Sequence, residues 1–514
     1  CPNVQKVVFF GMFVRKKKNK SGSVSIQVID KTSGNYKVLK TIGSSSDKQK
    51  IDTLFSEGQH WIKNYSNQIE MDIYGEKNQF DKFISSIQEI TVIGIELLLG
   101  KIFDEIGFNQ IKEQLFRQLV LARLCYPSSK LRTTDYLRKY HSICTDEDKI
   151  YRYLDILYNT QKEHVQQISY QHTLKVLNKA INIVFYDVTT LYFEIDREDD
   201  LRKTGFSKEG KHQNPQIVLG LLVSVDGYPL AYEIFEGNKF EGHTMLPVID
   251  TFKAKYNLEK LVIIADSGLM SNANIHELQT KGYEYILGAR IKNENATLKK
   301  KLLGLNLKDG ESKIFKKDIF TKLVVSYSQS RAVKDKANRL KGLRRLEKQI
   351  KSGNLTKANI NNRGYNKYLK LEGDIKVTIN KVKFAEDGKW DGLKGYLTNT
   401  SMSKKEILNN YSHLWKIEKA FRISKKDLRI RPIYHRLRQR IEAHICITFV
   451  AYKVYKELER QLKEKYSDLS PEKAIDIAKT IYSIKLETPL TKEVLEQNLI
   501  LNEEQRTLAK LFNF

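Results

Sequence analysis

Apolar and polar residues alternate from Val7 to Ile42, around turns rich in Gly, Ser and Asn. The SGS and SGN turns predict two hairpin loops, so this segment is expected to form a small antiparallel sheet. Its basic run, Lys16 to Lys20, is either a solvated turn or a contact with a nucleic-acid backbone. A helix is expected over Asp47 to Asn64, followed by a polar connector that ends near Ser85.

The segment from Ile87 to Lys179 has the apolar spacing of helices throughout. The sequence PSS at residues 127–129 predicts a break between two of these helices. The second helix is basic, which is similar to a helix-turn-helix whose second helix enters a DNA groove. An ordinary helical hairpin has the same pattern, and both interpretations stay open. The basic residues of this helix are Lys130, Arg132, Arg138 and Lys139.

The period of the pattern changes at Asn182, where INIVFYDVTTLYFE predicts a buried strand whose apolar run ends on Asp187. A hairpin over Gln216 to Gly237 follows, and then the strand LVIIAD, which ends on Asp266. With two predicted helices and the strand YEYILGAR, the order is three strands, a helix, a strand, a helix and a strand. Both aspartates are thus predicted at strand ends, where side chains leave the sheet and can converge.

An aspartate that ends an apolar strand is usually a turn former or a helix cap. Two aspartates at the first and fourth strands of this order are less ordinary. The arrangement resembles an RNase H-like fold, whose metal-binding carboxylates occupy those two places. The third carboxylate of that fold comes from a later helix that faces the sheet, and here the candidate is Glu418.

A single amphipathic helix is predicted over Asn410 to Leu428. Ser403 and Glu406 upstream have the spacing of a capping box. Its apolar residues at helical spacing are Leu414, Ile417 and Phe421.

Tyr411, Glu418 and Lys425 lie seven residues apart, so they share one stripe of this helix, about 21 Å long. A carboxylate between an aromatic ring and an ammonium suits a site that holds a metal ion beside a phosphate. The alternative is a solvated face on which Glu418 pairs with Arg422. Trp415 on the same helix is either a stacking residue for a displaced base or a core residue.

The net charge of +27 and the pI near 9.5 predict a polyanionic partner, because Lys and Arg that neutralise phosphates release condensed counterions. Residues 291–394 contain 27 Lys and Arg against 11 Asp and Glu, which is +16 of that charge. We interpret residues 291–394 as an insertion that binds the DNA backbone. Its predicted helix carries Arg344, Arg345 and Lys348. A solubilising insertion, a dimerisation hairpin and a merely basic structural protein are the alternatives.

Four cysteines without a CxxC pair indicate neither a disulfide framework nor a zinc site, so a reducing cytoplasm is expected. No run of about 18 apolar residues and no signal-peptide pattern is present, which argues against membrane insertion and secretion. We therefore expect a cytoplasmic protein.

Four motifs carry a resemblance to a known family: YDVTTLYFE, LRKTGFSKEGKHQNPQIVLGLLVSVDGYPLAYEIFEGN, ADSGLMSNANI and YSHLWKIEKAFRISK. Together they resemble a bacterial insertion-sequence DDE transposase, in the group with the signature Tyr-x2-Arg-x3-Glu-x6-Lys. The resemblance covers roughly Asn182 to Lys456. Tyr411, Glu418 and Lys425 keep the spacing of the signature, whereas Leu414 stands where the signature has arginine. A long-insertion subgroup of the family is similar to this chain in the pattern LW-x-IE-x2-FR. The resemblance implies a bacterial protein that is associated with the nucleoid when it is bound to DNA.

Phosphodiester cleavage at such a site needs Asp187, Asp266 and Glu418 to hold two Mg²⁺ ions, for which Mn²⁺ can substitute. The resemblance implies that Lys425 contacts a terminal phosphate and that Tyr411 abuts the end nucleotides. Further candidate DNA contacts are Trp415, Arg422, Lys130, Arg132, Arg138, Arg344, Arg345 and Lys348.

The expected fold class is α/β, an RNase H-like catalytic core interrupted by a basic β/α insertion and preceded by a small β domain and a helical DNA-binding domain. The expected boundaries are residues 1–86, 87–179, 180–290, 291–394, 395–465 and a helical tail over 466–514.

The expected function is that of an insertion-sequence transposase, which binds terminal inverted repeats, cuts the element ends and joins their 3′ ends to target DNA, as a homodimer on DNA. A repair or recombination nuclease of the same fold and a non-catalytic DNA-binding regulator are the alternatives.

Overall fold

The computed structural model describes residues 11–31, 34–65, 81, 83–178, 181–195, 197–207, 210–269, 271–353, 355, 359–361, 364–372, 376–487 and 492–514. Cys1 and most of the predicted polar connector lie outside these residues. The chain divides into two compact units. One contains Cys1–Ile87 and Thr488–Lys492, and the other contains Gln88–Glu487 and Glu493–Phe514.

The first unit is an antiparallel sheet in the order β1-β2-β3, covered by the helix α1. Ile26, Val28 and Ile29 on the central strand are fully buried. The predicted hairpins and the predicted helix are therefore confirmed. In the basic run, Lys16 pairs with Asp52 of the helix at 2.8 Å. The elements are β1 (Met12–Lys18), β2 (Val24–Asp30), β3 (Lys37–Ser45) and α1 (Lys48–Tyr65).

The second unit begins with a strand, β4 (Ile87–Val92), so the prediction that this region is helical throughout is wrong at its start. β4 joins β15 (Tyr482–Glu487) and β16 (Val494–Leu499) in a sheet of order β16-β15-β4. The tail predicted to be helical therefore contains a hairpin between α16 (Pro471–Ala478) and α17 (Glu503–Phe512). The partner strand of β4 lies almost 400 residues away in sequence, which local periodicity cannot reveal.

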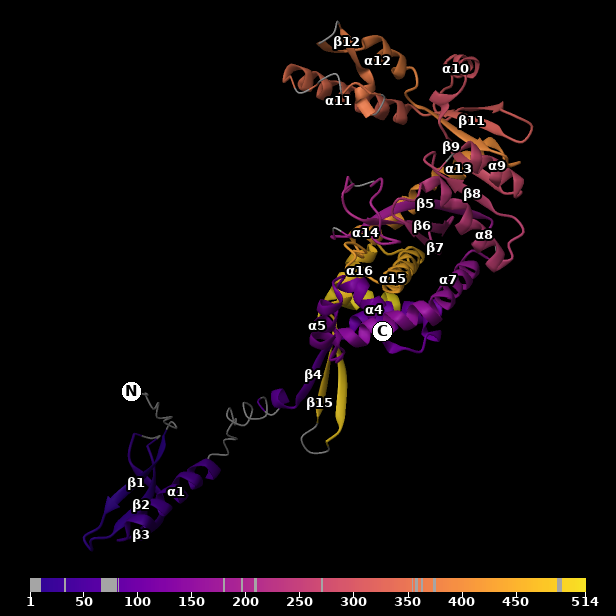
Figure 1. Ribbon diagram of the computed structural model, residues 1–514. Coiled ribbons are helices and arrows are strands. Elements are labelled where there is room, and N and C mark those ends of the chain that lie inside the picture. The colour runs from indigo at the N-terminus through magenta and orange to yellow at the C-terminus, as the bar shows by residue number, and fades with distance from the viewer. Residues whose placement is uncertain are drawn as a thin grey trace. The chain divides into compact units, whose positions relative to one another are not determined.

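Helices fill the chain between β4 and the main sheet. They pack around α15 (Arg438–Glu464), which is buried along most of its length and contacts α3, α4, α6 and α7 (Figure 1). α15 thus packs on the sheet and also forms the centre of a helical layer. The surrounding elements are η1 (Glu96–Gly100), α3 (Lys101–Ile106), η2 (Phe108–Gln110), α4 (Gln114–Cys125), α5 (Lys130–His141), α6 (Glu147–Ile156), η3 (Leu157–Gln161) and α7 (Lys162–Val176).

The main sheet has eight strands in the order β10-β11-β14-β9-β8-β5-β6-β7. β5 pairs with β6 antiparallel and with β8 parallel, and β8 pairs with β9 parallel. The predicted mixed α/β architecture is confirmed. The strands are β5 (Ile183–Tyr192), β6 (Gln216–Ser224), β7 (Pro229–Glu236), β8 (Val262–Ala265), β9 (Glu284–Ala289), β10 (Ser312–Lys316), β11 (Lys322–Tyr327) and β14 (Leu393–Thr398).

The two faces of this sheet belong to different cores, because successive side chains of a strand point to opposite sides. One core joins Tyr186 of β5 to α8 (Met245–Tyr256) and α9 (Asn272–Thr280). The other core joins Phe185 of β5 to α15 and to α14 (Trp415–Lys426). Short elements between the strands are η4 (Glu241–His243), η5 (Ile291–Asn293) and α10 (Ala296–Leu303).

The basic insertion has two parts. β10 and β11 extend the main sheet through β14, the strand on which the chain returns to the core. The second part packs α11 (Gln329–Lys351) against a two-stranded sheet, with Leu346, Tyr368 and Val377 in a small core. Leu346 and Ile350 therefore lie on the packing face of this helix. The remaining elements are η7 (Gly364–Tyr368), β12 (Leu369–Glu372), β13 (Lys376–Ile379) and α12 (Lys381–Gly388).

Candidate active site

Asp187 and Asp266 occupy neighbouring positions on two parallel strands. The last paired residues of β5 and β8 are Tyr186 and Ala265, and each aspartate is the next residue of its chain. Asp266 directly follows β8, as predicted. Asp187 does not end its strand, because β5 continues to Tyr192 on β6. The prediction of two strand ends is therefore wrong for Asp187, although the pairing between β5 and β8 does stop at that point.

Both aspartates point toward the face that α14 covers. Asp187 lies two residues after Phe185, and Asp266 lies two residues after Ile264, so each aspartate is on the same face of the sheet as that apolar residue. Both apolar residues belong to the core that contains α14. Asp187 is half-buried and Asp266 is exposed. Val188 donates its backbone N–H to Oδ1 of Asp187 at 2.8 Å, which fixes the direction of that carboxylate.

The predicted single helix is two helices, α13 (Lys404–Ser412) and α14. A tight turn joins them, in which Leu414 N–H donates to the Tyr411 carbonyl at 3.1 Å and Lys416 N–H donates to the His413 carbonyl at 2.9 Å. These bonds span three residues rather than four, so the chain is wound more tightly there than in an α-helix. The capping box of Ser403 and Glu406 is present and begins α13.

The apolar face of α14 is the one predicted. Ile417, Ala420 and Phe421 are buried, and the helix contacts β5 and β6. Glu418 projects from the other side of the helix and is exposed. Its charge acts on the same ammonium group as the charge of Asp266, that of Lys394 on β14. Lys394 on the sheet strand β14 thus interacts electrostatically with both Asp266 and Glu418.

Tyr411 is buried beside the acids, and its hydroxyl lies 3.5 Å from Oδ1 of Asp266. Burial, with the charge of Asp266 added, raises the pKa of Tyr411, so the phenol keeps its proton. The ring of Tyr396 packs edge-on at 4.8 Å between centroids. Gly288 makes room for this arrangement, because a Cβ at that position would lie 2.5 Å from the Tyr411 hydroxyl.

Lys394 and Arg331 are site residues that sequence reasoning missed. The Lys394 ammonium lies 4.4 Å from the centre of the Tyr411 ring. Burial and the nearby charge of Arg331 lower the pKa of Lys394, while Asp266 and Glu418 act in the opposite direction. Arg331 stands in the first turn of α11, and its charge acts on both Lys394 and Tyr411. The apolar strand pattern LKGYLT around Lys394 was the one available signal.

The donor chemistry of the three acids fits a hard divalent cation, since carboxylate oxygens are the ligands that Mg²⁺ and Mn²⁺ prefer. Within the residues that the structure describes, no three His, Cys, Asp or Glu side chains are close enough together to hold a metal ion as they stand. A lysine ammonium instead supplies positive charge to Asp266 and Glu418.

The other predicted contacts on α14 are spread along its length. Trp415 is 52% exposed, so its interpretation as a core residue is wrong. Arg422 is exposed and Lys425 is half-buried.

The predicted break after α4 is present, and Ser129 caps α5. Arg132 and Arg138 are exposed on this second helix, where Arg138 pairs with Asp135 at 2.8 Å. Lys130 is only 6% exposed, so it offers no ammonium on the outer face of the helix. On α11 the three predicted basic residues are exposed, away from the packed stripe; they are Arg344, Arg345 and Lys348.

Comparison with known proteins gives one family match and several structural matches. The model of the transposase DDE domain family matches residues 179–453, more than half of the chain, and spans both aspartates and Glu418. No curated protein sequence matches the chain.

The chain is similar to a piggyBac transposase in a synaptic complex with hairpin DNA, at 9% identity and a TM-score of 0.35 over 75% of this chain and 78% of that one. It is also similar to Mos1 transposase in a paired-end complex with the left transposon end, at 10% identity and a TM-score of 0.16 over 33% of this chain and 56% of that one. No helix among the described residues is long and apolar enough to cross a membrane.

Proposed function

The chain belongs to the transposase DDE domain family and is a DDE transposase, and from this premise we propose that it binds the inverted repeats of an insertion sequence, cuts the element ends and joins their 3′ ends to target DNA. The observation that carries the proposal is the placement of Asp187 and Asp266 at neighbouring positions of β5 and β8, on the face covered by the helix of Glu418. The first five strands of the sheet lie side by side in the order 3-2-1-4-5, which supports an RNase H-like core.

Asp187, Asp266 and Glu418 would hold two Mg²⁺ ions, or Mn²⁺ in their place. When bound, such ions activate a water or 3′-hydroxyl nucleophile and stabilise the leaving oxygen. The chain's own residues prepare this site. Lys394 balances the charge of Asp266 and Glu418, and the buried Tyr411 hydroxyl positions the Asp266 carboxylate.

DNA would lie across α14 and the start of α11. Lys425 and Arg422 on α14 would contact phosphates near the cut. The exposed ring of Trp415 would stack on a displaced base. The charge of Arg331 on α11 acts on Lys394 and Tyr411, which supports an insertion that holds the same DNA that is cut. Its exposed Arg344, Arg345 and Lys348 would contact the backbone, as would Arg132 and Arg138 on α5. Two element ends make a homodimer on DNA the expected assembly.

The decisive experiment is Glu418→Gln, which removes the charge of the third acid and keeps its size. Cleavage of a labelled inverted-repeat end in Mg²⁺ should fall by about two orders of magnitude or more, while DNA binding and the thermal melt stay near those of the parent. Asp427→Asn is the matched control, because Asp427 is an exposed acid at the end of the same helix. It should cleave like the parent.

A folded Glu418→Gln protein that cleaves normally would place the third acid elsewhere. Strand joining is scored in the same assay with a target duplex, because a repair or recombination nuclease would cut without joining.

A further inference from the structure

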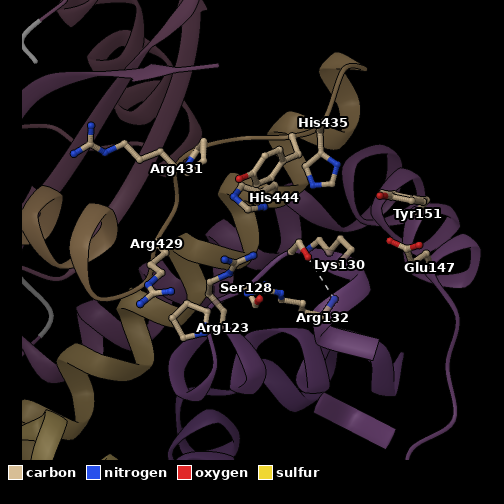
Figure 2. Close-up of a pocket in the computed structure, with 14 residues that line it drawn as sticks. Arg123, Ser128, Lys130, Arg132, Glu147, Tyr151, Arg429, Arg431, His435 and His444 are labelled. Atoms are coloured by element: carbon tan, nitrogen blue, oxygen red, sulfur yellow. Dashed lines mark hydrogen bonds between the residues drawn. The ribbon is translucent and has the colours of Figure 1, made fainter. Parts of the chain in front are cut away.

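A second site lies between α4, α5 and the segment that leads into α15. It is a cavity of about 500 Å³, and Figure 2 shows the side chains that line it. Arg123, Lys130 and Arg132 come from the two helices on either side of the PSS break. The lining residues are strongly biased in charge, with one acid, Glu147, against five Lys and Arg side chains. These are Arg123, Lys130, Arg132, Arg429 and Arg431, and two histidines, His435 and His444, complete the lining.

Two of these cations are buried without a counter-charge. Arg123 is 5% exposed and Lys130 is 6% exposed. Throughout the described residues, neither side chain makes an ion pair or a hydrogen bond to a carboxylate. Burial lowers the pKa of Arg123 to about 10. Burial, and then the neighbouring charge of Arg123, lowers the pKa of Lys130. The fold therefore places two like charges together in a region where water screens them poorly.

Two other cations of the same unit, the buried Lys453 and the half-buried Lys162, have hydrogen-bond or ion-pair partners. Lys453 on α15 is fully buried, but its ammonium donates to the Ser169 carbonyl at 2.9 Å and lies 4.4 Å from the centre of the Tyr228 ring. Lys162 is paired with the buried Glu442. Arg123 and Lys130 thus differ from these lysines in lacking such partners. A buried charge is normally paired, so a missing anion is the simplest explanation.

The histidines of the cavity support the same conclusion. His435 and His444 are 8% and 6% exposed, and their rings lie 5.3 Å apart. Nε2 of His444 contacts the Ile430 carbonyl at 3.0 Å, while its Nδ1 is buried without a partner among the described residues. An imidazole that gains a proton beside an anion donates through that free nitrogen.

The start of α5 adds a third observation. Ser128 and Ser129 line the cavity, and Ser129 is the N-cap of this 12-residue helix. The unpaired N–H groups of a first helical turn carry partial positive charge and attract anions. Guanidinium, ammonium and helix N–H groups around one cavity form the donor set that recognises phosphate.

We propose that this cavity binds a phosphate group, and that in the working protein the phosphate belongs to the DNA backbone. The DNA part rests on the proposed function, whereas phosphate binding does not. One of the two interpretations left open by the sequence places Lys130 and Arg132 in a DNA groove. Here they act instead on the backbone, because Lys130 is turned inward to the cavity. The α4–α5 region then anchors DNA without discriminating among sequences.

The first test titrates inorganic phosphate into the full-length protein in phosphate-free buffer and follows thermal unfolding. At a phosphate concentration of about 100 times Kd, the melting temperature of the parent should rise by about 3 °C. Lys130→Met should melt higher than the parent without phosphate, because it removes an uncompensated charge, and should lose the response. Lys453→Met is the matched control for a buried lysine and should keep the response.

A parent without a phosphate response, or a folded Lys130→Met with the full parental response, overturns the proposal. Arg429→Gln provides a second variant in case Lys130→Met does not fold, because Arg429 is an exposed residue on the rim. It should weaken phosphate binding about 3- to 10-fold. The titration is repeated on Glu418→Gln, so that its outcome is independent of whether the acids cleave DNA.

The second test identifies the source of the phosphate. Affinity for a terminal-repeat duplex and a random duplex is measured across salt concentrations. Lys130→Met should weaken binding to both duplexes by a similar factor, and the slope of log affinity against log salt should become shallower by about 0.9 for one lost contact. An unchanged slope, with the phosphate response lost, would overturn the DNA assignment in favour of a small phosphate-bearing ligand. A larger loss of affinity for the terminal-repeat duplex than for the random duplex would instead indicate that Lys130 contributes to recognition of base sequence.

Discussion

The acidic site, formed by Asp187, Asp266 and Glu418, and the basic cavity differ in how their charges are compensated. At the acidic site, Asp266 and Glu418 are exposed, so water screens their charges, and both interact electrostatically with the ammonium of Lys394. In the cavity, Arg123 and Lys130 are buried, and neither is paired with a carboxylate among the described residues. The first site is balanced before any ligand arrives, whereas the second is balanced only by an anion. The ligand of the first should therefore control reaction rate, and that of the second should control stability and affinity.

The largest effect is expected from the two aspartates. Asp187→Asn and Asp266→Asn should each lower cleavage by about two orders of magnitude or more, and the double variant should lose little more, because residues that act as a unit are not additive. The measurement is nicking of a labelled element end, with a thermal melt as the check on folding. Losses that multiply in the double variant would mean that the two carboxylates act separately.

The second effect is acid sensitivity from the cavity. Burial, and then the charges of Lys130, Arg123 and Arg440, lower the pKa of His435 to about 3; the rings of Tyr151 and His444 pack against it. The pKa of His435 in the folded protein lies below its unfolded value near 6.5. The free energy of unfolding therefore keeps its full contribution from neutral His435 above pH 6.5, and this contribution is lost as pH falls toward 3. From pH 7 to pH 5 this amounts to about 2 kcal/mol.

Unfolding of the parent and of His435→Asn is compared at these two pH values. The variant should lose part of the dependence, and the exposed His276→Asn should not. Phosphate should reduce the acid sensitivity of the parent, because an anion in the cavity favours protonated histidine. Equal pH dependence in all three proteins would remove His435 from this role.

The smallest effect is expected at Lys394. Lys394→Met removes the ammonium that lies beside Asp266 and Glu418, so the acids should bind a divalent cation about 3- to 10-fold more tightly. Stabilisation of the protein by Mg²⁺, measured by thermal unfolding, reports this without relying on cleavage. The same change should leave the phosphate response of the cavity unaltered. Weaker Mg²⁺ binding in the variant would show that Lys394 shapes the site more than it competes with the cation.

Sequence patterns could place Asp187, Asp266 and Glu418 on their strands and helix because each pattern is local, whereas their role as the three acids follows from the family resemblance and stays a prediction. Apolar alternation brackets Asp187, an apolar run precedes Asp266, and the buried spacing of Ile417 and Phe421 leaves Glu418 on the other side of its helix. The turn between α13 and α14 was missed, because helical periodicity tolerates a short tightening. The stripe still predicted that Tyr411 and Glu418 face a common region.

Features that depend on distant partners were not predictable. Lys394 lies next to Asp266 only because β14 returns to pair with β9 after the long insertion. Lys130 has the sequence context of an exposed helical lysine, and its burial depends on residues some 300 positions later, such as His435 and His444. Single-sequence periodicity contains no information about such contacts.

The return of the chain through β14 also has an evolutionary consequence. The insertion leaves the core after β9 and re-enters it on the neighbouring antiparallel strand, so its two ends are held together as in a hairpin. Closing a longer loop costs only about 0.6 kcal/mol for each doubling of its length. The segment between these strands can therefore be lengthened, shortened or exchanged among related elements while the aspartate strands keep their register. Changes confined to the segment around β12 and α12 leave Arg331 and Lys394 in place, so selection can alter the insertion there without removing the charges that act on the site.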